Sequence, residues 1–133
     1  MSNQSLREYS LWLEPGGESR ERLKNVIADL STEIQAPLFA PHVTLLGGIV
    51  MPVKKIKEEI KILAKGNGPI ATSFLSVNSS NLFFKSIYLE CEKTKSLMNF
   101  NLGAQKLFSK SFDYSPHLSL LYSDISQTEK DIL

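Results

Sequence analysis

Two short stretches of this sequence, Pro41-His-Val-Thr-Leu-Leu46 and Pro116-His-Leu-Ser-Leu-Leu121, are near copies of each other and decide how the chain is expected to fold. They match at the proline, the histidine and both leucines, and they differ only by Val against Leu and by Thr against Ser. The whole chain has two histidines, and both lie in these copies. A repeat of this kind indicates a domain built from two similar halves.

The segments around the two copies follow one order, which is a strand, a helix and then the Pro-His strand. This order occurs over residues 9–46 and again over residues 82–122. Alternating or β-branched residues indicate the strands, and apolar residues at helical spacing indicate the helices. The expected strands are 9–14, 42–46, 70–78, 82–90 and 116–122, and the expected helices are 18–34, 53–65 and 95–110.

Turn residues separate these elements. Pro15-Gly-Gly17 and Gly47-Gly48 are typical of turns, and Ser79-Ser-Asn81 would join strands 70–78 and 82–90 as a hairpin. We therefore expect a single α+β domain over residues 1–133. It would have two pseudo-symmetric lobes of mainly antiparallel sheet, with flanking helices around a central cleft.

Alternation along a strand gives each copy one polar and one apolar face. His42 and Thr44 would lie on one face of the first strand, and His117 and Ser119 on one face of the second. The leucines would lie behind them in the core. Two halves related by an approximate twofold axis would bring the two polar faces to one cavity.

Two imidazoles and two hydroxyls suit the hydrolysis of a phosphodiester, which needs a base for the nucleophile and an acid for the leaving oxygen. With an ordinary pKa of about 6.5, one histidine can be neutral while the other is protonated. Thr44 and Ser119 would donate hydrogen bonds to the phosphoryl oxygens. A zinc site is less attractive, because two histidines fall short of the usual three protein ligands. A purely structural role for the histidines is the alternative.

Composition limits the partners and the compartment. The chain carries 15 basic and 14 acidic residues, so its formal charge of +1 gives no field for binding long nucleic acid, whereas a small anionic ligand suits it. The lone Cys91 excludes an internal disulfide, and the N-terminal residues lack a signal-peptide pattern, so we expect a cytoplasmic protein. No apolar run approaches the ~20 residues of a membrane span.

At the motif residues the chain resembles the two-histidine phosphoesterase superfamily, whose signature is a pair of His-x-Thr/Ser motifs. The segments 9–15, 41–44 and 116–122 are most similar to the cyclic phosphodiesterase branch known from plants and yeast. The resemblance runs over nearly all 133 residues.

The resemblance implies opening of ADP-ribose 1″,2″-cyclic phosphate, a by-product of tRNA splicing, to the 1″-phosphate, and of nucleoside 2′,3′-cyclic phosphates to 2′-phosphates. It implies no metal and no organic cofactor. It also implies that His117 is the base, that His42 is the acid and that Thr44 and Ser119 contact the phosphate. The symmetry of the motifs leaves the order of the two histidines open.

Three aromatic residues are weaker candidates for substrate contact. Tyr122 matches a position near the family's site, but it lies five residues after His117, so only a twist or bulge would bring it to the histidine's face. Trp12 could stack on a base or belong to the core, and Phe84 could do so or pack on the sheet. Nearby lysines could steer an anion toward the site or lie on a solvated face; they are Lys54, Lys55 and Lys85.

The second half looks incomplete at its C-terminus. Ser126-Gln-Thr-Glu129 has the form of a capping box, so a helix should begin where only a few residues remain. Family members continue with that helix and further strands. The chain is then a shortened natural version, a fragment, or a protein completed by another chain, for example in a homodimer.

Two other functions stay open. The chain could be a phosphodiesterase of 2′,5′-linked or RNA-terminal phosphates, which would call for a more basic cleft. It could also be a non-catalytic binder of cyclic nucleotides or RNA ends, if truncation loosened the site by the ~1 Å that matters for catalysis.

Overall fold

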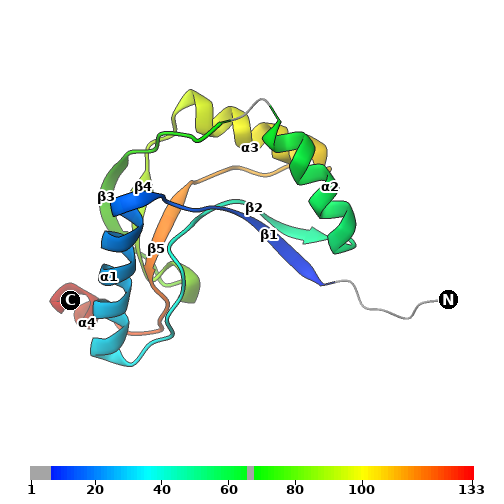
Figure 1. Cartoon of the computed structure of the whole chain (residues 1–133). Coiled ribbons are helices and arrows are strands. Elements are labelled where there is room, and N and C mark those ends of the chain that lie inside the picture. The colour runs from blue at the N-terminus through cyan, green and yellow to red at the C-terminus, as the bar shows by residue number, and fades with distance from the viewer. Residues whose placement is uncertain (1–6, 66–67) are drawn as a thin grey trace. The chain divides into compact units, whose positions relative to one another are not determined.

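The computed structural model describes residues 7–65 and 68–133 (Figure 1). The strands lie in one sheet in the order β1-β2-β5-β4-β3, and the pairs β2–β5, β5–β4 and β4–β3 are antiparallel. The predicted α+β class with a mainly antiparallel sheet is therefore confirmed. In chain order the elements are β1 (Glu8–Leu13), α1 (Gly17–Ile34), β2 (Val43–Val50), α2 (Val53–Ala64), β3 (Phe74–Ser79), the 3₁₀ helix η1 (Phe83–Lys85), β4 (Ile87–Cys91), α3 (Lys95–Leu107), β5 (His117–Leu121) and α4 (Gln127–Ile132).

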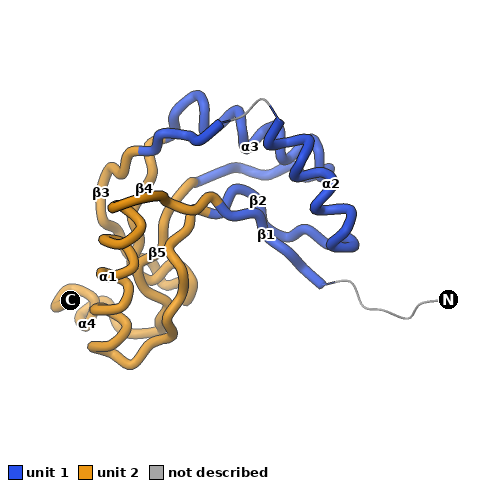
Figure 2. Tube along the Cα trace, viewed as in Figure 1, with its two compact units in different colours: residues 1–12, 44–72, 93–115 blue, residues 13–43, 73–92, 116–133 orange. Residues whose placement is uncertain are grey.

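The chain forms two compact units, and each takes segments from both halves of the sequence (Figure 2). The first unit holds residues 1–12, 44–72 and 93–115, and the second holds residues 13–43, 73–92 and 116–133. Both histidines therefore belong to the second unit. The predicted cleft between two lobes stays a prediction.

In the second unit, helix α1 contacts strand β5. The helical stripe seen in the sequence places Ile27 in the interior, where it is 1% exposed. Leu118 and Leu121 of β5 are equally buried. Apolar contact across this interface holds β5, and with it His117, in place.

In the first unit, two side-chain hydrogen bonds fix the backbone of β2. The buried amide of Asn101 on α3 donates to the carbonyl of Leu45 at 2.8 Å, and the Tyr114 hydroxyl donates to the carbonyl of Thr44 at 2.8 Å. Gln105 donates in turn to the Asn101 side-chain oxygen. Asn101, a residue type of low helix propensity, is thus a hydrogen-bonded core residue.

Some element boundaries differ from those expected. Strand β2 continues through Gly47-Gly48 to Val50, so the expected turn there is wrong; Gly48 stays in the strand with φ 68°, a conformation open to glycine. The strand expected from residue 82 begins only at Ile87, because η1 precedes it. The expected capping box at Ser126 is confirmed, and α4 follows it.

Candidate active site

Strand register brings both histidines to one face of the sheet in the second unit. Val43 of β2 lies opposite Leu118 of β5, and each directly follows a histidine. Because cross-strand partners share a face and neighbours alternate, His42 and His117 lie on the face opposite these two apolar residues. Ser119 shares the face of His117 by the same alternation.

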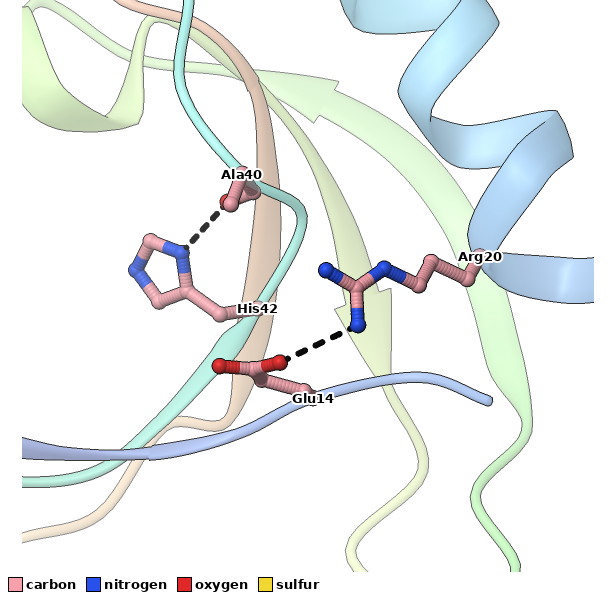
Figure 3. Close-up of polar contacts among 4 residues, drawn as sticks. All are labelled: Glu14, Arg20, Ala40 and His42. Carbon is pink, nitrogen blue, oxygen red and sulfur yellow. Dashed lines mark hydrogen bonds and ion pairs between the residues drawn. The ribbon is translucent and has the colours of Figure 1, made fainter. Parts of the chain in front are cut away.

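One ring nitrogen of His42 is hydrogen-bonded to the backbone. The side chain is 8% exposed, and Nδ1 lies 2.9 Å from the carbonyl oxygen of Ala40 (Figure 3). Since a carbonyl only accepts hydrogen bonds, Nδ1 carries the hydrogen. The proton that His42 gives or takes is therefore the one on the other nitrogen, Nε2.

Burial sets the ionisation of His42. Desolvation lowers its pKa below the ordinary 6.5, and the Ala40 carbonyl and the Glu14 carboxylate oppose that shift. Glu14 is itself paired with Arg20 at 3.3 Å (Figure 3). The neutral ring is therefore favoured in the free protein at neutral pH.

This lowered pKa predicts that folding stability falls at acidic pH. The unfolded chain binds the His42 proton more tightly than the folded chain does. The free energy of unfolding therefore decreases as the pH falls from about 6.5 through the lowered pKa, and this group causes no loss at higher pH. His42→Asn keeps an N–H for Ala40 and does not titrate. Urea unfolding at about pH 7.5 and about pH 5 should show a larger loss for the wild type than for this variant. Equal losses would contradict the linkage.

His117 is half-buried and packs against an aromatic neighbour. The Tyr88 ring lies edge-on to the imidazole, with ring centroids 5.5 Å apart and an interplanar angle of 72°. Tyr88 lies opposite Ser119 in the register, so it shares the face of the two motif residues. One side of the His117 ring is thus fixed by apolar contact.

The two motif hydroxyls are placed differently. The Ser119 hydroxyl is buried and donates to the carbonyl oxygen of Phe84 at 2.7 Å. Because a hydroxyl has a single hydrogen, Ser119 must turn from Phe84 to donate to a phosphate. Thr44 is the first residue of the segment 44–72 of the first unit, and its backbone carbonyl accepts the hydrogen bond from the Tyr114 hydroxyl. The contact of its side chain with a phosphate stays a prediction.

A bulge settles the orientation of Tyr122. Ser119 pairs with Tyr88, whereas Leu121 pairs with Ile87, so Leu120 is an extra residue in β5. The extra residue shifts the alternation by one, which places Tyr122 on the face of Ser119. The bulge needed to bring Tyr122 to the face of His117 is therefore present.

Tyr122 belongs to an aromatic cluster that the sequence did not reveal. Its ring stacks on Phe39 with centroids 3.7 Å apart, and the Phe84 ring meets it edge-on at 5.1 Å. Burial raises the pKa of the Tyr122 hydroxyl, so it stays protonated and can donate a hydrogen bond. Phe39 lies in the exit loop after α1, where no periodic pattern indicates a contact.

The other two aromatic candidates are both exposed. Phe84 lies in η1 and is 68% exposed, so its expected packing within a strand is wrong. Trp12 is 46% exposed, and its indole N–H donates to the Ser10 hydroxyl at 3.0 Å. The alternative that Trp12 is a core residue is therefore wrong as well.

A cluster of metal-binding side chains or a membrane-spanning helix would indicate other classes of function. Within residues 7–65 and 68–133, no three or more His, Cys, Asp or Glu side chains gather as a metal site would require. Over the same residues, no helix combines the length and apolar character that crossing a bilayer demands.

Comparison with known proteins matches the chain to one family over nearly its full length. The model of a family described as cyclic phosphodiesterase-like protein matches residues 8–133. The chain is 29% identical over 124 residues to a cyclic phosphodiesterase of Arabidopsis thaliana, covering 92% of this chain and 68% of that relative.

Two fungal relatives carry the name 2′,3′-cyclic-nucleotide 3′-phosphodiesterase. The Kluyveromyces lactis protein is 30% identical, over 87% of this chain and 64% of its own length. The Phaeosphaeria nodorum protein is 27% identical, over 86% of this chain and 68% of its own length. The chain thus spans about two thirds of the length of the curated relatives it matches.

Proposed function

Because the chain belongs to the family of cyclic phosphodiesterase-like proteins, we propose that it hydrolyses cyclic phosphodiesters with His42 and His117 as its acid–base pair. The observation that carries this proposal is the register of β2, β5 and β4, which gives His42, His117 and Ser119 a common sheet face. The hydrogen bond from Nδ1 of His42 to Ala40 adds a defined tautomer. A fixed tautomer is what proton transfer through Nε2 requires.

The reaction is an in-line displacement at phosphorus. A water oxygen attacks the phosphorus and gives its proton to one imidazole, while the bond from phosphorus to the ring-closing ester oxygen breaks and that oxygen takes a proton from the other imidazole. We assign the base to His117 and the acid to His42. Burial makes protonated His42 a stronger acid, and the negative charge of the bound phosphate favours its protonated form.

Hydroxyl groups would stabilise the charge that builds on the phosphoryl oxygens. The proposed donors are Thr44, Ser119 and Tyr122. The protonated Tyr122 hydroxyl, on the face of Ser119, supports its inclusion. Among the aromatic side chains, exposed Phe84 and Trp12 are the proposed platforms for a nucleobase.

The proposed substrates are ADP-ribose 1″,2″-cyclic phosphate and nucleoside 2′,3′-cyclic phosphates, opened without a metal or organic cofactor. Each nucleotide should be converted to a phosphomonoester at an unchanged rate in excess EDTA, because the two imidazoles perform both proton transfers. Chromatography of the products against 2′- and 3′-monophosphate standards identifies the bond that opens. A rate abolished by EDTA and restored by a divalent cation would contradict the metal-free mechanism.

Binding without turnover is the competing outcome. Ser119 donates its only hydrogen to the Phe84 carbonyl, so its hydroxyl does not already point a hydrogen at a phosphate. This observation favours the second candidate, a non-catalytic binder of cyclic nucleotides or RNA ends. Calorimetric titration of the same nucleotides, run beside the assay, distinguishes it from the enzyme. Parallel assays with 2′,5′-linked and RNA-terminal phosphates test the remaining phosphodiesterase alternative.

A further inference from the structure

The short helix η1 presents its side chains from a backbone whose three carbonyls are all hydrogen-bonded. Its three successive carbonyls all accept hydrogen bonds: Phe83 from the Ser123 N–H at 3.1 Å, Phe84 from the Ser119 hydroxyl at 2.7 Å and Lys85 from the Ser80 hydroxyl at 2.6 Å. The bonds to the Phe83 and Lys85 carbonyls do not involve motif residues, so they hold η1 in place when Ser119 turns toward a phosphate.

The last residue of η1 is a half-buried lysine on the face of the histidines. The ammonium of Lys85 lies over the Tyr88 ring, 4.6 Å from its centroid. The ion pairs of the described residues do not involve Lys85, so this lysine has no carboxylate partner among them. A cation that is aimed by a ring and partly desolvated is suited to binding an anion.

The Tyr88 ring contacts both this cation and the proposed base, His117. One contact of the ring is with Lys85 at 4.6 Å, and another is with the His117 imidazole at 5.5 Å. The oxygen atom that exchanges a proton with the catalytic imidazole must lie within hydrogen-bond reach of it. The proposed donors to the phosphoryl oxygens are hydroxyl groups, so Lys85 is left for a different anionic group of the same ligand.

We propose that Lys85 binds a second anionic group of the substrate, a phosphomonoester or diphosphate remote from the cyclic ester. This inference rests on the proposed function and narrows its substrate class. The preferred substrates are cyclic-phosphate nucleotides that carry such a group, and nucleosides with the cyclic phosphate alone are poorer substrates.

A matched pair of substrates tests the role of Lys85. Adenosine 2′,3′-cyclic phosphate is compared with the same compound bearing a 5′-phosphate, so that one group is the only difference. Lys85→Met keeps an apolar stem over Tyr88 and should lower kcat/KM for the 5′-phosphorylated substrate about tenfold or more, because a charged hydrogen bond is lost. For the other substrate the change should stay below about threefold.

Two further variants control the comparison. Lys85→Arg keeps the charge and should retain the preference for the 5′-phosphate. Lys24→Met removes an exposed lysine of α1 and makes the same change in net charge, so it should leave the preference unchanged. A preference lost equally in Lys24→Met would mean general attraction and would overturn the specific role of Lys85.

The outcomes separate this inference from the proposed function. If the wild type hydrolyses both nucleotides equally well and Lys85→Met alters neither rate, the inference is wrong and the phosphodiesterase stands. If neither nucleotide is hydrolysed, the proposed function fails. Calorimetry on His117→Asn then still tests Lys85. Adding Lys85→Met to this variant should abolish any tighter binding of the 5′-phosphorylated nucleotide. If His117→Asn alone binds the two nucleotides equally, the inference is overturned.

Discussion

Replacing His117 by alanine should lower kcat for cyclic phosphate hydrolysis about 10²- to 10⁴-fold, because one of two proton transfers loses its catalyst. The variant should remain folded, since His117 is half-buried and its neighbour Leu118 supplies the core contact. His42→Asn should cause a loss of the same order while keeping the N–H that bonds Ala40. Steady-state kinetics with a nucleoside 2′,3′-cyclic phosphate measures both losses.

The double variant provides the sharper test of a pair. Residues that act in one catalytic unit are not additive, so His42→Asn with His117→Ala should be little worse than the worse single variant. Glu92→Gln, an exposed carboxylate just after β4, serves as the control and should keep the wild-type rate. A loss of less than about tenfold in either single variant would exclude that histidine as a proton-transfer catalyst.

Leu121→Ala should lower the free energy of unfolding by about 2–5 kcal/mol, the largest effect on stability that we expect. Leu121 is 0% exposed and lies in register with Ile87, so removing its side chain leaves a cavity in the second unit. Urea denaturation followed by circular dichroism gives the change in unfolding free energy.

The matched control is another leucine of the same unit. Leu82 is 64% exposed, and Leu82→Ala should change stability by no more than about 0.5 kcal/mol. Equal effects of the two substitutions would mean that burial in β5 does not determine the stability of this unit.

Local patterns were enough to predict much of the fold. The helical stripe of α1, the capping box at Ser126 and the strand that follows His117 all depend on neighbours within a few residues, and each appears in the structure. The duplicated motif singles out His42 and His117 as candidates, and their catalytic role stays a prediction. Their placement on one face needs only alternation and a single register contact between Val43 and Leu118.

Features set by distant residues could not be predicted. The partner of Asn101 is a carbonyl of β2, 56 positions away, so the sequence shows only an asparagine that weakens a helix. The grouping into units is also non-local, because each unit combines segments from both halves. Tyr122 depends on an extra residue in β5, which only its pairing with β4 reveals.

Because of that extra residue, the length of β5 determines which face of the sheet Tyr122 lies on. Losing Leu120 would exchange the faces of all residues after it and turn Tyr122 away from His117, although every motif residue would still be present. A one-residue deletion here would thus be more damaging than many substitutions. Two chains with the same motifs can therefore differ in whether this tyrosine lies on the face of His117 and Ser119.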